Sequence, residues 1–368
     1  MKFTCSAEAL QRGIGAVQNA VGTKISNPIV ENIKVEVTQD GLAFYGTNLS
    51  LHIRCQVPCE TTTPGMVALP TDYLVSTFRE LPACDVKVET KGHDVIFRTP
   101  SGEVKLRALP ADDFPEFEGE IQGASFQLPV AVFKDICRKT LFATSPEKAR
   151  FELDGVKWVL STAGTLTCVS TDGRRLSHVA RAMEDIKADA TALIPSKTLN
   201  ELARIVPTDG DISITLGKNK AYFECADIAL SSALFEDRFP PYEQIIPKAF
   251  EISLDIPREP FIHAIRMVGA LADDRTKLVK LTLEKGRMIL QSEQEQVGDA
   301  REELAVDYSG APMTAGYKAS YLLDAMRAID DATVQLNLIN PGSPGVFKSG
   351  EMEKFTHVVM PMQISDDV

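Results

Sequence analysis

Side chains that could do chemistry are present in this sequence, but their spacing does not favour it. No histidine stands four residues from another histidine or beside a cysteine. Cys55 and Cys59 are four residues apart and lack a second pair, so we expect no zinc site. The isolated histidines are His52, His93, His178, His263 and His357.

Phosphate and acid-base motifs are equally weak. Gly13 and Gly15 lie inside a helical pattern, whereas a phosphate-binding loop needs glycines between a strand and a helix. The carboxylate pairs at 112–113 and 273–274 fall in predicted loops and read as solvated charge. We therefore predict no enzyme activity, no cofactor and no metal. The alternative is an α+β enzyme whose site assembles from residues distant in the sequence.

The stretch Thr171–Leu176 is the most informative one inside the chain. A hairpin turn explains Asp172 and Gly173, but it does not explain Arg174, Arg175 and the leucine that follow. With Pro240 and the apolar tail at 358–362, these residues predict an adaptable apolar groove with cationic walls. The alternative is that they are only strand ends that pack together.

Composition restricts the class of protein. The chain has 368 residues, 44% hydrophobic content and a net charge of -12. No apolar run reaches the roughly 18 residues that a membrane span needs, so we expect a soluble, cytoplasmic protein of two or three domains. Seven scattered cysteines do not resemble a disulfide framework, and we expect them to be reduced.

Three landmarks recur with one period. Loop lysines at 24, 148 and 277 are separated by 124 and 129 residues, and Phe-Pro pairs at 114 and 239 by 125. Predicted second helices begin at 70, 195 and 318, separated by 125 and 123 residues. A repeat of this length is a domain. The sequence thus predicts an α+β fold of three two-helix, multi-strand domains at 1–120, 121–250 and 251–368.

The predicted helices form the basic part of an acidic chain. They cover residues 6–21, 70–81, 129–144, 195–206, 257–271 and 318–329. Together they carry eleven Lys and Arg against seven Asp and Glu. Surface helices often carry such charges, but Arg138 and Lys139 in one helix, together with the loop lysines, indicate a surface that faces phosphates, and Lys197 and Arg204 are further candidates for it.

Several motifs, in this order, resemble those of one family. They are Met1-Lys2-Phe3, Thr171–Leu176, Arg238-Phe239-Pro240, Tyr308-Ser309-Gly310 and Val358–Met362. The chain is similar along its whole length to the bacterial DNA polymerase III beta subunit, the DNA sliding clamp. The resemblance implies a processivity factor built as a head-to-tail homodimer, a six-domain ring whose helices line a hole around duplex DNA.

The resemblance also implies partners and their sites. An apolar cleft would take a short linear motif from the DNA polymerase III alpha subunit, the clamp loader and repair proteins. It would be formed by Leu153, Thr171, Gly173, Arg174, Arg175, Leu176, Pro240, Ile245, Val346, Val358, Val359, Met360, Pro361 and Met362. Sequence-independent contacts to double-stranded DNA would come from Lys24, Lys148, Arg150 and Phe151.

This sequence departs from the family pattern at a few positions. They are Glu147 and Glu152 near the DNA contacts, and Arg174, Gln244, Gln363 and the extension 365–368 near the cleft. The two glutamates bear on the DNA contacts, and the changes near the cleft bear on peptide preference. A clamp paralogue specialised for repair or drug tolerance would share the fold, and it stays an alternative.

Overall fold

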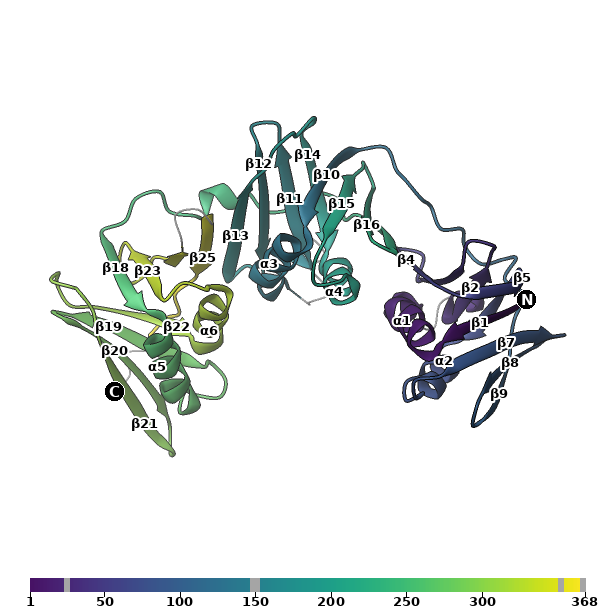
Figure 1. Ribbon diagram of the computed structural model, residues 1–368. Helices are drawn as coiled ribbons and strands as arrows, with labels where there is room; N and C mark the ends of the chain where they lie inside the picture. The colour runs from purple at the N-terminus through teal and green to yellow at the C-terminus, as the bar shows by residue number, and fades with distance from the viewer. Residues whose placement is uncertain (23–26, 146–152, 350–353, 365–368) are drawn as a thin grey trace. The chain divides into compact units, whose positions relative to one another are not determined.

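The computed structural model describes residues 1–22, 27–145, 153–349 and 354–364 (Figure 1). Its α-helices occur in pairs, two in each predicted repeat. They are α1 (Ala7–Val17), α2 (Thr71–Phe78), α3 (Val130–Thr140), α4 (Ser196–Ile205), α5 (Arg258–Ala270) and α6 (Ala319–Ala328). All six predicted helices are confirmed, with ends that differ by a few residues.

Helices and strands follow one another along the chain in the same order in each repeat, except that the first repeat has an additional strand, β5. The first repeat has β1 (Lys2–Ser6), β2 (Asn32–Val37), β3 (Leu42–Thr47), β4 (Leu51–Val57), β5 (Glu60–Thr63), β6 (Gly65–Pro70), β7 (Asp85–Lys91), β8 (Asp94–Thr99) and β9 (Gly102–Arg107). The second has β10 (Ala124–Pro129), β11 (Gly155–Ser161), β12 (Thr165–Thr171), β13 (Arg175–Ala182), β14 (Ala190–Pro195), β15 (Asp211–Leu216), β16 (Lys220–Cys225) and β17 (Ile228–Ala233). The third has β18 (Ile252–Pro257), β19 (Leu278–Glu284), β20 (Arg287–Gln294), β21 (Gly298–Ala305), β22 (Met313–Lys318), β23 (Thr333–Leu338), β24 (Gly345–Ser349) and β25 (Lys354–Val359).

Each helix follows a strand without a loop. The prolines expected to begin helices are instead the last residues of β6, β10, β14 and β18. The first strand, β1, was not predicted, because five residues of mixed polarity give little signal. At its end Ser6 caps α1, and its hydroxyl oxygen accepts a hydrogen bond from the Ala9 N–H at 3.1 Å.

The chain forms two compact units. The first consists of residues 1–134 and 197–235, and the second of residues 135–196 and 236–368. The first unit holds a five-stranded sheet, β5-β1-β7-β8-β9, and an eight-stranded sheet, β10-β15-β16-β17-β4-β3-β2-β6. The second holds an eight-stranded sheet, β14-β11-β12-β13-β25-β24-β23-β18, and a four-stranded sheet, β21-β20-β19-β22.

Each eight-stranded sheet joins strands of two successive repeats. β4 pairs with β17, the last strand of the second repeat, with Leu51 opposite Ser232. In the same way β13 pairs with β25, the last strand of the third repeat, with Arg175 opposite Val359. The equivalent strands β21 and β9 are edge strands of their sheets. The same kind of strand pairing, which we call the joint, is thus formed twice in the chain. The two strands that could form a third joint, β21 and β9, lie at sheet edges.

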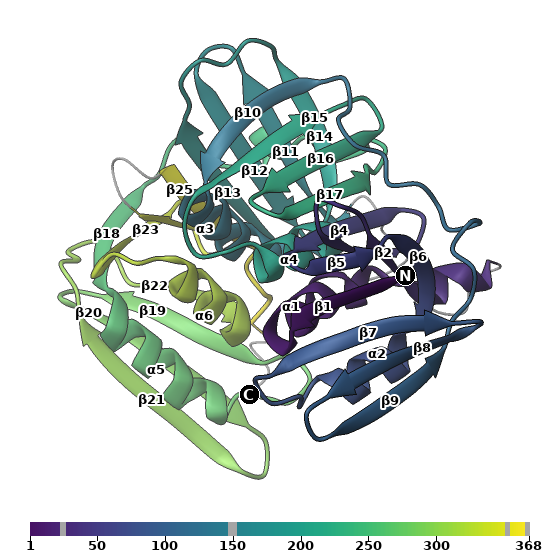
Figure 2. The ribbon, with the colours of Figure 1, turned by 45° about the vertical axis from the view of Figure 1, so that its right-hand side comes forward.

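In each unit one pair of helices packs against the sheets. In the second unit α5 lies along the four-stranded sheet with α6 beside it (Figures 1 and 2). In the first unit α1 packs on β3 and β4. Gly13 allows this close approach, because a Cβ there would lie 2.2 Å from Cδ2 of Phe44. A packing role therefore explains the helical glycine that is not part of a phosphate loop.

The chain end repeats the contact made by the first linker. Leu109 forms a β-bridge to Ala68 in β6, and Met362 forms the equivalent bridge to Gly316 in β22. The Met362 N–H donates to the Gly316 carbonyl at 2.8 Å. In the third repeat the tail therefore takes the place that the linker has in the first repeat.

Candidate functional site

The predicted turn at 171–175 connects β12 to β13 and is held by its own side chains. One carboxylate oxygen of Asp172 accepts hydrogen bonds from the N–H groups of Arg174, at 2.9 Å, and Arg175, at 3.0 Å. The Thr171 hydroxyl accepts from the Gly173 N–H and donates to the Arg175 carbonyl. Gly173 has a φ of 84°, which favours glycine. The hairpin prediction is confirmed.

The two arginines after this turn differ in environment. Arg174 is exposed, whereas the Arg175 side chain is only 11% exposed. Arg175 donates to Asp172 at 3.0 Å and to Asp324 of α6 at 2.7 Å, and its guanidinium lies 4.4 Å from the centre of the Tyr321 ring. It also donates to the carbonyl of Phe142. Arg175 therefore positions the turn against α6 and the segment that follows α3, and Arg174 supplies the exposed positive charge.

An apolar floor lies beside the turn on the sheet that joins the second and third repeats. Leu176 stands opposite Val358, and Val358 stands opposite Val346 on the next strand. All three are at most 1% exposed. Strand alternation puts Val359 on the other face, with Arg175, so this predicted cleft residue belongs to the core behind the floor.

The rim of this floor comes from the linker after the second repeat. Ile245 is 36% exposed and Pro240 is half-buried. Tyr242, which is buried, lies 6.0 Å from the ring of His178 and 6.4 Å from that of Phe239. Leu153 is also buried, at 5% exposure.

The tail completes the site. The Met360 N–H donates to the Arg174 carbonyl at 2.9 Å, and the Met362 N–H donates to Gly316. The backbone is therefore held at both ends of this short segment, while the Met360 side chain is 41% exposed. A separate groove of about 790 Å³ follows Pro361 and Met362 on the side of β19, β20 and β22, and none of its lining residues belongs to the turn, floor or rim. The turn, floor, rim and tail residues all belong to the second unit.

The floor strands also hold the end of α3. The Ser170 hydroxyl donates to the Thr140 carbonyl at 2.6 Å, and the Ser177 hydroxyl donates to the Lys139 carbonyl. These carbonyls belong to the last turn of the helix, which has no partners for them within the helix. Hydrogen bonds therefore connect the floor strands to the end of α3.

The cations predicted to face DNA differ in their exposure and in their ion pairs. Lys24, Lys148, Arg150 and Phe151 lie outside the described residues. Arg138 approaches Asp135 and Asp330 at 2.5 Å each, and Arg204 approaches Glu201 at 2.8 Å. Lys139 is buried, 2% exposed, so it does not face solvent phosphates.

Lys197, in α4, is exposed, and so are two cations that the sequence pattern did not single out, Arg79 and Arg266. Among the described residues no ion pair neutralises these three side chains. Their exposed helical positions could have been found from the helical period, because each helix buries only one face. Sequence reasoning also did not identify Tyr321 as part of the site. Nothing in its local sequence indicates contact with Arg175, which lies far earlier in the chain.

His357 lies in the core behind the cleft, on β25. It is fully buried, its ring is 5.2 Å from that of Phe142, and neither ring nitrogen has a hydrogen-bond partner among the described residues. Burial lowers the pKa of His357 to about 3, and the nearby charge of Arg175 acts in the same direction. The ring is therefore neutral in the folded chain.

Neither a metal centre nor a membrane helix is found in the described ranges. They contain no group of three or more His, Cys, Asp or Glu side chains placed to hold a metal ion. None of their helices is long and apolar enough to cross a membrane.

Comparison with known families gives three consecutive matches. Residues 1–118, 127–241 and 243–363 match the N-terminal, central and C-terminal domains of the DNA polymerase III beta subunit. Curated proteins named "Beta sliding clamp" from Chlamydia muridarum and Caulobacter vibrioides are each 28% identical. The matches cover 100% and 99% of this chain and all of each relative.

Solved structures agree with these matches. A sliding clamp from Pseudomonas aeruginosa bound to griselimycin has 25% identity and a TM-score of 0.93, covering 99% of this chain and 100% of that one. The sliding clamp of Bacillus subtilis, 23% identical with the same coverage, has a TM-score of 0.93 and shows likeness of fold.

The buried histidine predicts a pH dependence of stability. The unfolded chain takes up a proton at His357 near pH 6.5, while the folded chain does so only near pH 3. The free energy of unfolding should therefore fall as pH drops through this window, by about 2 kcal/mol between pH 7 and pH 5 from this group. His357→Phe should remove that part of the slope in urea unfolding at the two pH values.

His263→Gln is the matched control, because His263 is exposed on α5 of the same unit. It should keep the wild-type slope. Equal slopes for wild type and His357→Phe would contradict a neutral, buried ring.

Proposed function

Because this chain belongs to the bacterial DNA polymerase III beta subunit family, the DNA sliding clamps, we propose that two copies close head to tail into a ring around duplex DNA. The name shared by the relatives favours a sliding clamp over a specialised paralogue. The three domains of each copy, with boundaries near 120 and 250, would give six around the hole. The ring would act by topology, without chemistry of its own, in the cytoplasm where the bacterial chromosome lies.

The repeated strand joint carries this proposal. β4–β17 and β13–β25 are the first two joints, and a third of the same kind would pair β21 of one copy with β9 of the other. Unpaired edge strands are open to pairing with another chain. Because the two edges differ, the contact is heterologous, and it closes when two copies satisfy both edges.

The equivalence of the joints also gives a register. Arg175 at the start of β13 faces Val359, which lies three residues before the bridging Met362. The equivalent start of β21 is Gly298, and the residue three before the bridging Leu109 is Leu106. With Gly298 opposite Leu106, Lys105 stands opposite Asp299, and Glu103 opposite Arg301. Opposite charges thus meet at both pairs, which supports the third joint.

The cleft is the proposed seat for partners. A short apolar motif from the polymerase alpha subunit, the clamp loader or a repair protein would lie on Leu176, Val346 and Val358 and displace rim side chains such as Ile245. Met360 would cover it from the tail, and Arg174 would meet acidic residues of the motif. Arg175 and Val359 would support this surface from behind.

Contact with DNA would be made by the exposed cations of the helices. Lys197 is the predicted residue that is exposed and has no ion pair among the described residues, and Arg79 and Arg266 are additional candidates. Arg138 and Arg204 could exchange their carboxylate partners for phosphates. Such contacts carry no base reading, so the ring could slide.

Topological binding predicts retention that depends on the form of the DNA. After loading by the clamp loader, the protein should stay on nicked circular DNA and leave linear DNA through its ends. Gel filtration of the complexes measures the retained fraction. Blocking both ends of the linear DNA with bound protein is the control and should restore retention. Equal loss from circular and unblocked linear DNA would contradict encirclement.

The proposed register predicts a charge exchange at the dimer contact. Light scattering of the wild type should give about twice 40.2 kDa. Lys105→Glu and Asp299→Lys each place like charges opposite, and each should raise the dimer dissociation constant by about three- to tenfold. The two changes together should restore wild-type affinity.

Lys87→Glu is the control for this exchange, because Lys87 is exposed in β7, an interior strand of the same sheet. It should leave the dimer unchanged. A stable wild-type monomer at micromolar concentration would refute the ring. If Lys105→Glu with Asp299→Lys does not restore the wild-type dimer affinity, the proposed register is wrong, but the ring is not refuted.

The cleft predicts a loss of peptide binding without loss of assembly. Truncating the exposed rim side chains in Met360→Ala with Ile245→Ala should weaken binding of a fluorescent peptide from the polymerase alpha subunit by about thirtyfold, since each side chain contributes roughly 1 kcal/mol of apolar contact. Leu49→Ala removes a comparably exposed apolar side chain from the first unit and should have no effect. Unchanged anisotropy with the double variant would place the peptide elsewhere.

A further inference from the structure

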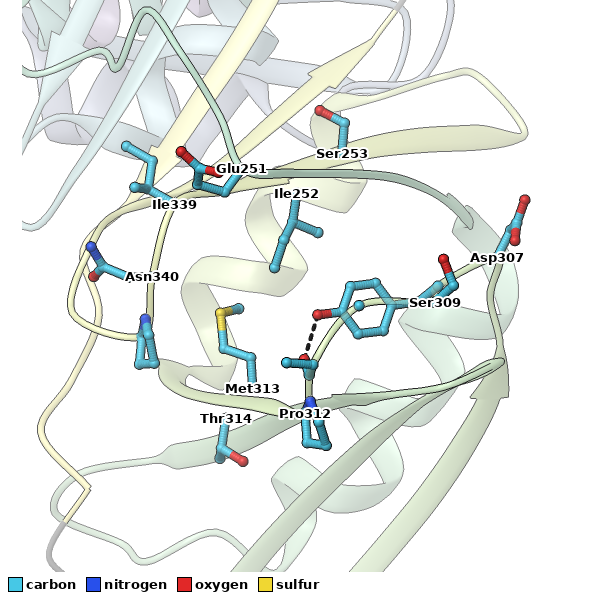
Figure 3. Close-up of a pocket in the computed structure, with 14 residues that line it drawn as sticks. Glu251, Ile252, Ser253, Asp307, Ser309, Pro312, Met313, Thr314, Ile339 and Asn340 are labelled. Carbon is cyan, nitrogen blue, oxygen red and sulfur yellow. Dashed lines mark hydrogen bonds between the residues drawn. The ribbon is translucent and has the colours of Figure 1, made fainter.

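A groove of about 730 Å³ lies on the third repeat and shares no residue with the proposed peptide cleft. One wall is the start of β18 with the preceding Glu251, and the other is the segment 307–312 with the start of β22. Figure 3 shows the side chains of Ile252 and Met313 pointing towards each other from the two walls. The groove is therefore apolar in its middle and bordered by polar groups.

The wall formed by β18 is a free sheet edge. β18 is the last strand of its eight-stranded sheet and pairs only with β23 among the described strands. Its outer edge therefore presents backbone N–H and C=O groups without a strand partner. Such an edge is a template for an added strand.

The first repeat shows what fits on this edge. There the equivalent strand β1 is covered by β5, with Lys2 opposite Thr63, Phe3 opposite Thr61 and Thr4 opposite Glu60. Counted back from the helix that follows each strand, these β1 residues correspond to Ser253, Leu254 and Asp255. The chain itself thus contains an extended, threonine-rich segment that pairs with this type of edge.

The third repeat has no β5 in this place. The segment at 307–312 is instead folded on itself, because the Tyr308 hydroxyl donates to the Ala311 carbonyl at 2.6 Å (Figure 3). Its backbone bonds to another loop, with the Gly286 N–H donating to the Tyr308 carbonyl at 2.8 Å. The groove is the space that this arrangement leaves between the segment and the free edge.

The charge around the groove selects the occupant further. Glu251 and Asp307 line it and are exposed, Asp255 follows along the free edge, and no Lys or Arg is among the lining residues. An extended segment with basic residues at its ends would complement these carboxylates.

We propose that the β18 edge and this groove form a second docking site, which takes an extended, β-branched peptide with basic flanks from a partner protein by strand addition. Backbone hydrogen bonds to Ile252–Asp255 supply register, as β5 does for β1. Apolar contact with Ile252 and Met313 supplies affinity, and Glu251 and Asp307 bind the basic flanks.

The probe is a fluorescent peptide of sequence Lys-Thr-Thr-Thr-Val-Lys, which takes its threonines from β5 and is blocked at both ends. It should bind the full-length dimer in fluorescence anisotropy and slow amide hydrogen exchange at 252–255. Replacing its central threonine by proline removes a backbone donor and should abolish binding. Replacing its lysines by glutamates should weaken binding at least tenfold.

Protein variants test the same site from the other side. Glu251→Gln with Asp307→Asn should weaken the basic peptide about three- to tenfold, as expected for two exposed charge pairs. Glu295→Gln, in an exposed turn outside the groove, is the control. Ser309→Trp should fill the groove and abolish peptide binding. If this substitution disturbs folding, the variant Glu251→Gln with Asp307→Asn still tests the site. Saturation of the proposed cleft with the polymerase peptide should leave this binding intact.

Three results would overturn the proposal. The first is that the proline-containing peptide binds as tightly as the original peptide. The second is that the variant Glu251→Gln with Asp307→Asn binds the peptide as tightly as the wild type, and the third is that the peptide slows amide hydrogen exchange outside 252–255 and not within it. A fourth result would also overturn the proposal. If amide hydrogen exchange at 252–255 slows as the protein concentration rises, and the peptide does not bind, the occupant of the edge is a second copy of this chain.

Discussion

Hydrogen bonding between the fourth strand of one repeat and the last strand of the next repeat joins this chain together. The β4–β17 and β13–β25 ladders make two eight-stranded sheets, and each sheet crosses a boundary between repeats. A continuous sheet resists bending at the boundary far better than a flexible linker would, because every backbone group in the ladder has a partner. The same rule leaves β9 and β21 at the ends of the series, each paired on one side only among the described strands. The proposed ring follows from this constraint, since a second copy supplies the missing partner for each edge.

The proposed cleft is a product of one of these joints. Pairing of β13 with β25 places Leu176 beside Val358, although they are far apart in the chain. The tail continues from β25 and bonds first to Arg174 and then to Gly316. Its backbone forms a β-bridge as the linker at Leu109 does, and the Met360 side chain is 41% exposed. A partner bound there would touch two repeats at once.

Several charged side chains of this protein are held in place by ion pairs within the chain. Asp172 and Asp324 hold Arg175, and Asp135 and Asp330 hold Arg138 and Lys139. Pairs of this kind fix geometry more than they add stability, because each partner loses hydration. The acidic excess of the chain is therefore compatible with a local positive surface. Only cations without a carboxylate beside them, such as Lys197 and Arg174, are immediately available to an anionic ligand.

The sequence by itself determined the local elements and their repetition. Helical periodicity found all six helices, and the Asp172-Gly173 pair found the hairpin, because these signals depend on residues a few positions apart. The equal spacing of landmarks found three repeats. Tertiary structure alone decided which strands of different repeats pair, that Val359 and Arg175 lie behind the cleft, and that Lys139 is buried. It also decided that Tyr321 reaches the turn and that β18 keeps a free edge where β1 has β5. These outcomes depend on contacts between residues far apart in the chain, and no local pattern encodes which distant group will satisfy a given charge or backbone edge.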